Sequence, residues 1–142
     1  DALRELRAAN SGLEDSPGLE AAVTEAMGVA YLGQHDYAQA TRQFENLGRI
    51  DRRRYRDVAD YQLARTLFDR GDRDGAKAKL TSLLARLDGE NAVPAEHAQD
   101  QARNLLRQID PSAVPQPAMP NGLTPELLPM LQQQGLNLGG PQ

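Results

Sequence analysis

Apolar side chains recur at intervals of three and four residues along most of the first 110 positions of the chain. This spacing places them on one face of an α-helix, so it predicts helices rather than strands. Short breaks rich in Gly, Asp or Pro separate the periodic segments and supply helix caps and stops. The helices are expected at about 2–10, 17–33, 37–47, 53–69, 74–87 and 94–109.

The stretch 24–50 has the pattern of one helical hairpin. Gly28 and Ala40 are small, so the two helices can approach closely where these residues meet. Aromatic rings fill the space around them, from Tyr31, Tyr37 and Phe44. The break between the helices is Gln34-His35-Asp36, and Asp36 is placed to cap the second helix.

A second stretch, 57–87, repeats the first after a shift of about 36 residues. Ala64 then corresponds to Gly28, and Leu80 corresponds to Phe44. A repeat of this length is typical of a helical solenoid. The helix predicted at 94–109 has one apolar and one polar face, as expected of a helix that caps such a stack.

This pattern resembles the tetratricopeptide repeat, whose unit is normally about 34 residues. The first unit carries the family pattern at Met27-Gly28, Tyr31, Asp36-Tyr37, Ala40 and Phe44. The second keeps it at Leu63-Ala64, Gly71-Asp72, Ala76 and Leu80, but has Asp60 where a bulky aromatic residue is usual. The resemblance covers about 16–110 and implies an all-α fold: a short right-handed α-solenoid of two hairpins with a C-terminal capping helix.

Within that family, the run 55–80 and the Ala-rich helix after it are similar to bacterial envelope proteins. These are the outer-membrane-assembly lipoproteins and the membrane-anchored periplasmic proteins of the YfgM type. The resemblance implies an upstream anchor and a role in holding or scaffolding envelope proteins. The chain begins at Asp1 without Met, so we expect a processed form or a fragment. The bacterial periplasm or envelope is the favoured location, with the cytoplasm as the alternative.

Three regions are expected: an N-terminal helix at 1–15, which could end a preceding repeat, the repeat domain at 16–110, and a tail at 111–142. The tail begins as a Pro-rich linker that cannot be helical and is expected to be largely flexible. Its short apolar motif consists of Leu127, Leu128, Met130 and Leu131. This motif could dock into the chain's own groove or a neighbour's, giving self-association, or bind a different protein; otherwise it is a disordered tail with a marginal helix.

Composition narrows the classes of function. A net charge of −4 and a pI near 5.1 argue against binding to nucleic acids or anionic membranes, and no apolar run could insert into a bilayer. Cys is absent, and no metal-ligand spacing, phosphate-binding loop or nucleophile motif occurs. His35 and His97 are interpreted as surface residues because neither has an evident oriented partner. We therefore expect neither a cofactor nor an enzyme activity.

The densest charged feature is the basic stretch 49–56, which is predicted to be a connector between the hairpins. Its guanidinium groups could hold phosphate or an acidic partner segment, since their geometry matches both. The alternative is a solvated connector neutralised by Asp51, Asp57 and Asp60. The arginines concerned are Arg49, Arg52, Arg53, Arg54 and Arg56.

The first helix of each hairpin is expected to line a concave face that holds a peptide. Arg65 could bind a carboxylate of that peptide, and Tyr61 could pack against its apolar side. The candidate contacts on this face are Thr24, Gln34, Tyr61, Gln62, Arg65 and Asp69.

The predicted function is a non-catalytic protein–protein interaction module, an adaptor or chaperone-like scaffold that presents this groove to a partner segment. Two alternatives stay open. The chain could be a structural packing subunit of a larger assembly, or a regulatory or accessory domain of a longer protein.

Overall fold

The computed structural model describes residues 2–10, 16–89 and 96–115. These residues form six α-helices and a short 3₁₀ helix: α1 (Ala2–Asn10), α2 (Pro17–Gly33), α3 (Tyr37–Ile50), α4 (Arg52–Asp69), α5 (Arg73–Leu87), α6 (Glu96–Ile109) and η1 (Pro111–Ala113). No strand occurs within these ranges, so the predicted all-α class is confirmed. The tail motif, with Leu127, Leu128, Met130 and Leu131, lies outside the described residues.

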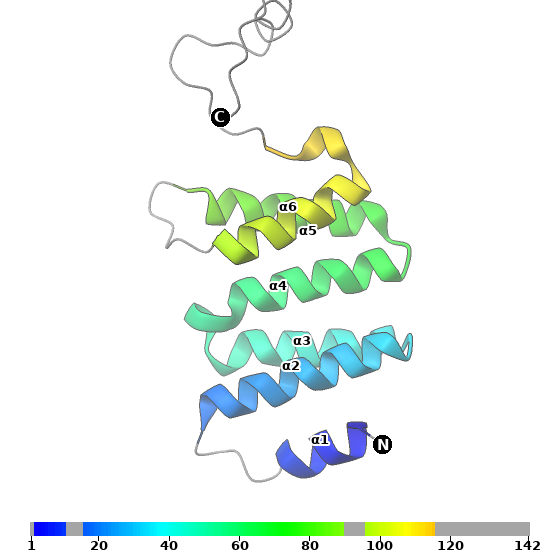
Figure 1. The fold of residues 1–142 in the computed structure, drawn as a ribbon, viewed down its shortest axis with the longest axis vertical. Coiled ribbons are helices and arrows are strands. Elements are labelled where there is room, and N and C mark those ends of the chain that lie inside the picture. Colours follow the sequence, from blue (N-terminus) through cyan, green and yellow to red (C-terminus); the bar gives the residue numbers. More distant parts are fainter. Residues whose placement is uncertain (1, 11–15, 90–95, 116–142) are drawn as a thin grey trace, which may run out of the picture.

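The helices are stacked in the order of the sequence, with α1 at one end and α6 at the other (Figure 1). Each helix packs against the next one along the chain, and α6 also contacts α4. At the first end, α1 inserts the buried side chain of Leu3 into a cluster with Tyr31 of α2, and the Arg7 guanidinium donates a hydrogen bond to the Tyr31 hydroxyl.

The two turns inside the hairpins are built alike, and in both an aspartate caps the following helix as the sequence predicts. The Asp36 carboxylate accepts a hydrogen bond from the Gln39 backbone N–H at 3.2 Å. The Asp72 carboxylate accepts one from the Gly75 N–H at 2.9 Å. The residue before each cap has a positive φ, +59° at His35 and +94° at Gly71.

The prediction that a basic connector joins the two hairpins is wrong. Instead of ending before Gly48, α3 runs on to Ile50, and α4 begins only two residues later. Asp51 alone separates the helices: its backbone is extended, and its carboxylate accepts hydrogen bonds from the N–H groups of Arg53 and Arg54 at 3.0 and 3.2 Å. Gly48 lies inside α3 because the helix packs closely there; a Cβ at this position would lie 3.3 Å from that of Ala59.

The core of each hairpin forms where its two helices cross. In the first hairpin the Phe44 ring lies directly against Gly28, so that a Cβ at this glycine would come within 2.7 Å of the ring. In the second hairpin the corresponding contact region contains Ala64 and Leu80, both fully buried. The predicted close approach of the two helices at Gly28 is confirmed.

The last helix covers the second hairpin. Ala102, Leu105 and Leu106 of α6 are buried in one cluster with leucines of α5, while its other side is exposed. After α6 the chain forms η1, which corrects the prediction that helical structure is impossible from Pro111 onward. The Asp110 carboxylate caps η1 through the Ser112 N–H at 3.0 Å.

Asp110 also ties the end of α6 to α5. The Lys77 ammonium group donates a hydrogen bond to the Asp110 carboxylate at 2.5 Å. This bond is the main reason that the pKa of Asp110 falls to about 2, and bonds from Ser112 act in the same direction.

Candidate functional site

Two surface hollows use opposite sides of α4. The α3–α5 hollow has a volume of about 610 Å³ and is lined by α3, α4 and α5. The α4–α6 hollow has a volume of about 300 Å³ and is lined by α4 and α6. A helix turns by about 100° per residue, so the α4 residues of one hollow point away from those of the other. The α4 residues that line the α3–α5 hollow are Arg52, Arg56, Ala59, Asp60 and Leu63. Those that line the α4–α6 hollow are Tyr61, Arg65, Phe68 and Asp69.

The α3–α5 hollow combines an apolar base with a charged rim. Phe44 and Ala59 are buried at its base, and Leu63 is half-buried beside them. Five of the lining side chains are cationic and only two carry carboxylates. The cations are Arg49, Arg52, Arg56, Lys79 and Arg86, and the carboxylates are Glu45 and Asp60.

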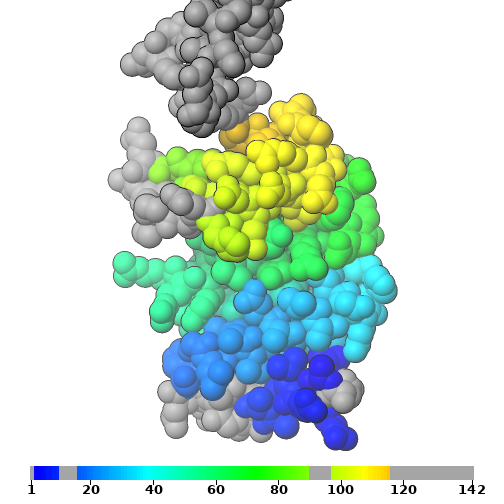
Figure 2. Space-filling model, in the orientation of Figure 1, coloured from blue at the N-terminus to red at the C-terminus, as the bar shows by residue number. Residues whose placement is uncertain are grey.

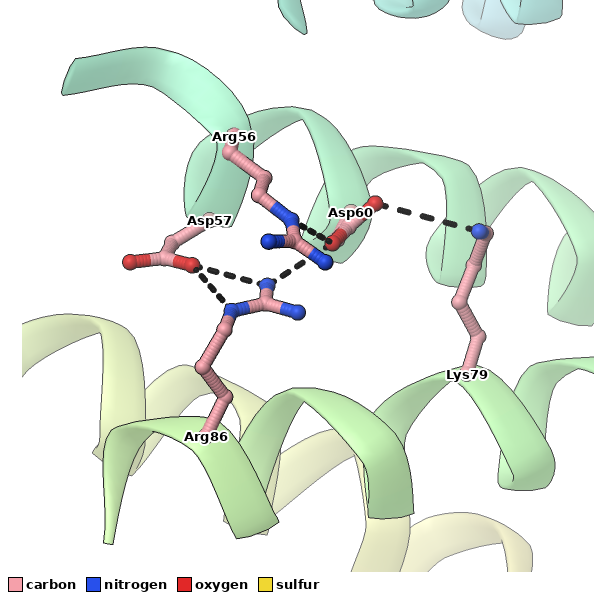
Figure 3. Close-up of polar contacts among 5 residues, drawn as sticks. All are labelled: Arg56, Asp57, Asp60, Lys79 and Arg86. Atoms are coloured by element: carbon pink, nitrogen blue, oxygen red, sulfur yellow. Dashed lines mark hydrogen bonds and ion pairs between the residues drawn. The ribbon is translucent and has the colours of Figure 1, made fainter. Parts of the chain in front are cut away.

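An ionic network joins α4 to α5 at one side of this hollow (Figure 3). The Arg86 guanidinium donates to Asp57 Oδ1 at 3.0 Å from Nε and at 2.8 Å from Nη2, and Nη2 also donates to Asp60 Oδ2 at 2.8 Å. Asp60 has two more distant partners, Arg56 and Lys79, each at 3.8 Å. Burial has the largest single influence on the pKa of Arg86 and opposes its charge, but the two aspartates together outweigh it and raise the pKa.

The sequence-based interpretation of the basic stretch is therefore changed. Asp57 and Asp60 are engaged chiefly by Arg86 of α5, a residue that the sequence analysis did not single out. Asp51 serves as a helix cap. Arg49 and Arg52 line the hollow without an ion pair to any residue that the structure describes, whereas Arg53 and Arg54 lie outside the lining.

Lys79, Ser82 and Arg86 of this hollow were missed by the sequence analysis. One signal could have indicated them: the three residues are spaced by three and four positions and therefore share a face of α5. Since α5 packs on α4, that face meets the aspartates Asp57 and Asp60, which are themselves three residues apart on α4.

The α4–α6 hollow brings together some of the residues predicted to line the groove. Tyr61 and Arg65 are partly exposed, and Arg65 makes no ion pair with a described residue. Across from them lie Gln101, Asn104, Leu105 and Gln108 of α6.

Gln62 and Thr24 were also predicted to line the groove. Both are buried, so this part of the prediction is wrong. Gln62 is only 8% exposed, and its Nε2 donates a hydrogen bond to Glu25 of α2 at 2.9 Å. Thr24 is only 5% exposed. Gln34 and Asp69 are exposed, and Asp69 also accepts a hydrogen bond at its backbone carbonyl from the Tyr37 hydroxyl at 3.2 Å.

One side of α2 exposes an apolar row that the sequence analysis did not identify. Leu19 is 51% exposed and Val29 38% exposed, although both are large and apolar. The row follows helical spacing and is formed by Leu19, Ala22, Ala26, Val29 and Gly33. Only Glu20 and Glu25 are charged in this helix, so α2 is apolar around most of its circumference. A helix of that kind is normally buried on all sides.

Neither histidine forms a recognisable catalytic arrangement in the described structure. His35 Nδ1 lies 3.1 Å from the Tyr37 hydroxyl, and both groups are at the surface. His97 is exposed at the start of α6. Within the described ranges, no three His, Cys, Asp or Glu side chains come together as a metal site would require. None of the helices described is both long and apolar enough to cross a membrane.

Comparisons of the chain with protein-family models, with curated proteins and with solved structures found no match. The structure by itself defines the class of the protein as an all-helical stack whose neighbouring helices pack together. The two hollows and the apolar row of α2 are the features of the molecule that bear on its function.

Proposed function

We propose that this chain is a non-catalytic protein–protein interaction module of the tetratricopeptide type, which holds a segment of a partner protein in a groove along α2, α4 and α6. The observation that carries the proposal is the exposed apolar row of α2. Apolar rows of this kind, next to polar side chains, are typical of sites that bind amphipathic helices or other peptide segments.

The apolar row and the α4–α6 hollow are expected to face the same groove. Equivalent residues of stacked repeats face the same side of the stack, so residues of α2 and α4 that correspond under the shift of about 36 residues are expected to face the same groove. Under this shift Val29 corresponds to Arg65, and Ala22 to Val58. Figures 1 and 2 show α2 and α6 on the same side of the molecule, with α4 between them along the stack.

The chemistry of the groove indicates what it would bind. Leu19, Val29 and the alanines between them offer an apolar surface for aliphatic side chains. Tyr61 can pack against an apolar side chain and still direct its hydroxyl to solvent. Arg65, which is not engaged by a described carboxylate, can pair with an acidic residue of the same segment.

A pull-down from the organism's own cell extract tests this function. The bait is the full chain, alongside Val29→Glu, Arg65→Glu and the control Arg42→Glu, which changes an exposed residue of α3 outside both hollows. We expect a specific partner that is lost with both groove variants and retained by the control. Retention of every partner by the groove variants would refute the groove.

The alternative function is that of a packing subunit of a larger assembly. In that case a second copy of the chain would cover the apolar row of α2. Light scattering after gel filtration distinguishes the two functions. A chain that is oligomeric on its own, and that becomes monomeric with Val29→Glu, would be a packing subunit. The expected result for an adaptor is a monomer in both forms. The location in a bacterial envelope remains a prediction from the narrower resemblance.

A further inference from the structure

We infer that the α3–α5 hollow is a second binding site, on the opposite side of α4 from the groove, and that it takes a carboxylate-rich segment of a partner polypeptide that contains an apolar side chain. This site is independent of the proposed groove, because the two share no residue of α4.

The charge around the hollow is the first argument. Its rim contains five cationic side chains and two carboxylates, although the chain as a whole carries a net charge of −4. A local excess of positive charge on an acidic protein attracts an anionic partner.

Most of this positive charge is available to a ligand. Arg86 is bound to Asp57 and Asp60 at 2.8–3.0 Å and has a structural role. Arg56 and Lys79 approach Asp60 only to 3.8 Å, a weak interaction that a ligand carboxylate could replace. Arg49 and Arg52 have no ion pair with a described residue. An arginine guanidinium can donate two parallel hydrogen bonds to one carboxylate, so Arg49 and Arg52 could each bind an acidic side chain of the ligand.

The base of the hollow argues for a polypeptide rather than a free anion. Leu63 is half-buried and presents apolar atoms beneath the charged rim, while Phe44 and Ala59 are buried behind it. A space of about 610 Å³ is large enough for several side chains. A segment with an aliphatic residue between acidic residues would use the base and the rim together.

Two other anionic ligands fit less well. A phosphate group commonly uses the free N–H groups at the start of a helix, but the Asp51 carboxylate already accepts from those of Arg53 and Arg54. Single-stranded nucleic acids need exposed aromatic rings for stacking, and the only ring in the lining, that of Phe44, is fully buried.

The chain's own C-terminal segment is also a poor occupant. Residues 116–142 contain a single acidic side chain, Glu126, so they cannot match the several cations of the rim. An acidic segment of another protein is therefore the occupant that the charges favour.

Fluorescence anisotropy with a labelled synthetic peptide, glutamates flanking a single leucine, tests this site in the full chain at low ionic strength. We expect saturable binding that Arg49→Glu plus Arg52→Glu weakens about ten-fold or more, because two charge-assisted contacts are reversed. The matched control is Arg53→Glu plus Arg54→Glu. It makes the same change in net charge next to the same helix turn but outside the hollow, and should alter the affinity by no more than about two-fold.

Three further measurements sharpen the result. Replacing the leucine of the peptide by glycine should weaken binding, because the apolar base then has no side chain to bury. Val29→Glu should leave the affinity unchanged, which separates this site from the groove. Circular dichroism should show all variants folded.

Three outcomes would overturn the inference. The wild-type chain could fail to bind the peptide, or the two arginine pairs could contribute equally, which would indicate general charge attraction. A polyphosphate or an oligonucleotide of equal charge that binds more tightly than the peptide would assign the hollow to a different class of ligand.

Discussion

The two hairpins pack their helices together at corresponding positions but with different pairs of side chains. In the first, Gly28 of α2 leaves room for the Phe44 ring of α3. In the second, the corresponding residues are Ala64 and Leu80, so a larger residue on one helix accompanies a smaller one on the other. The volume available between the helices is thus shared between the partners in two ways. Neither residue of a pair can be understood without the other.

A second difference concerns the ends of the hairpins. Ala21 and Ile50 of the first hairpin belong to an apolar cluster that residues of α4 complete. The residues that correspond to them in the second are Asp57 and Arg86, which form an ion pair. The charges at the α3–α5 hollow therefore belong largely to the second hairpin, and only Glu45 and Arg49 come from the first. The same two positions therefore hold an apolar pair in one hairpin and an ion pair in the other. The ion pair also places Arg86 in the lining of the α3–α5 hollow.

The largest effect is expected when the packing pairs are exchanged. Gly28→Ala should lower the free energy of unfolding by about 2 kcal/mol, because the added methyl group would overlap the Phe44 ring. Phe44→Leu alone should cost about 1–3 kcal/mol through lost contacts. The double variant recreates the pair of the second hairpin, so its loss should be smaller than the sum by about 1 kcal/mol or more. Urea denaturation followed by circular dichroism measures all three.

The control for this cycle is Gly33→Ala in the last turn of α2. Apart from its chain neighbours and the backbone of its own helix, no atom lies within 4 Å of a Cβ built there, so the variant should be as stable as the wild type or slightly more stable. Additive losses for Gly28→Ala and Phe44→Leu would contradict the idea that the two residues share one volume.

A smaller effect is expected when the ionic pair is replaced by its apolar counterpart. Arg86→Ile leaves Asp57 without its partner in a partly buried position and should lower the free energy of unfolding by about 1 kcal/mol after allowance for solvent screening. Adding Asp57→Ala imports the residues of the first hairpin and should recover most of that loss. Thermal unfolding at low and high salt provides the measurement, and the wild type should lose more stability with salt than the double variant. If the double variant is the least stable of the three, the two hairpins are not interchangeable at these positions.

Local signals in the sequence were sufficient to predict the helices and two of their caps. Asp36 and Asp72 each cap a helix with a neighbour three residues away, so the sequence alone contains the interaction. The predicted end of the helix at 47 is wrong, because Gly48 does not stop α3 but packs against Ala59 of the next helix. An isolated glycine in a helical pattern can mark either the end of the helix or a close contact with another helix. Only the structure of the packing partner distinguishes the two.

The candidate sites depended still more on tertiary contacts. Gln62 has the spacing of a groove residue, but it lies on the side of α4 that meets Glu25 of α2. Arg86 was overlooked because its carboxylate partners are more than 25 residues away in the sequence. Tyr61 and Arg65 line the α4–α6 hollow, and helical periodicity alone sets them apart from the buried side of α4; their contact with a partner stays a prediction.

The smallest effect is expected at the turns inside the hairpins, where His35 and Gly71 occupy corresponding places with φ of +59° and +94°. Gly71→His should cost about 1 kcal/mol, since a side chain is disfavoured at positive φ. The reverse change, His35→Gly, relieves that strain but loses the contact with the Tyr37 hydroxyl and makes the unfolded chain more flexible, so its net effect should stay within about 0.5 kcal/mol. Urea denaturation of both variants tests this asymmetry. Equal and opposite changes would mean that backbone strain alone sets the stability of these turns, and that the histidine contact contributes nothing.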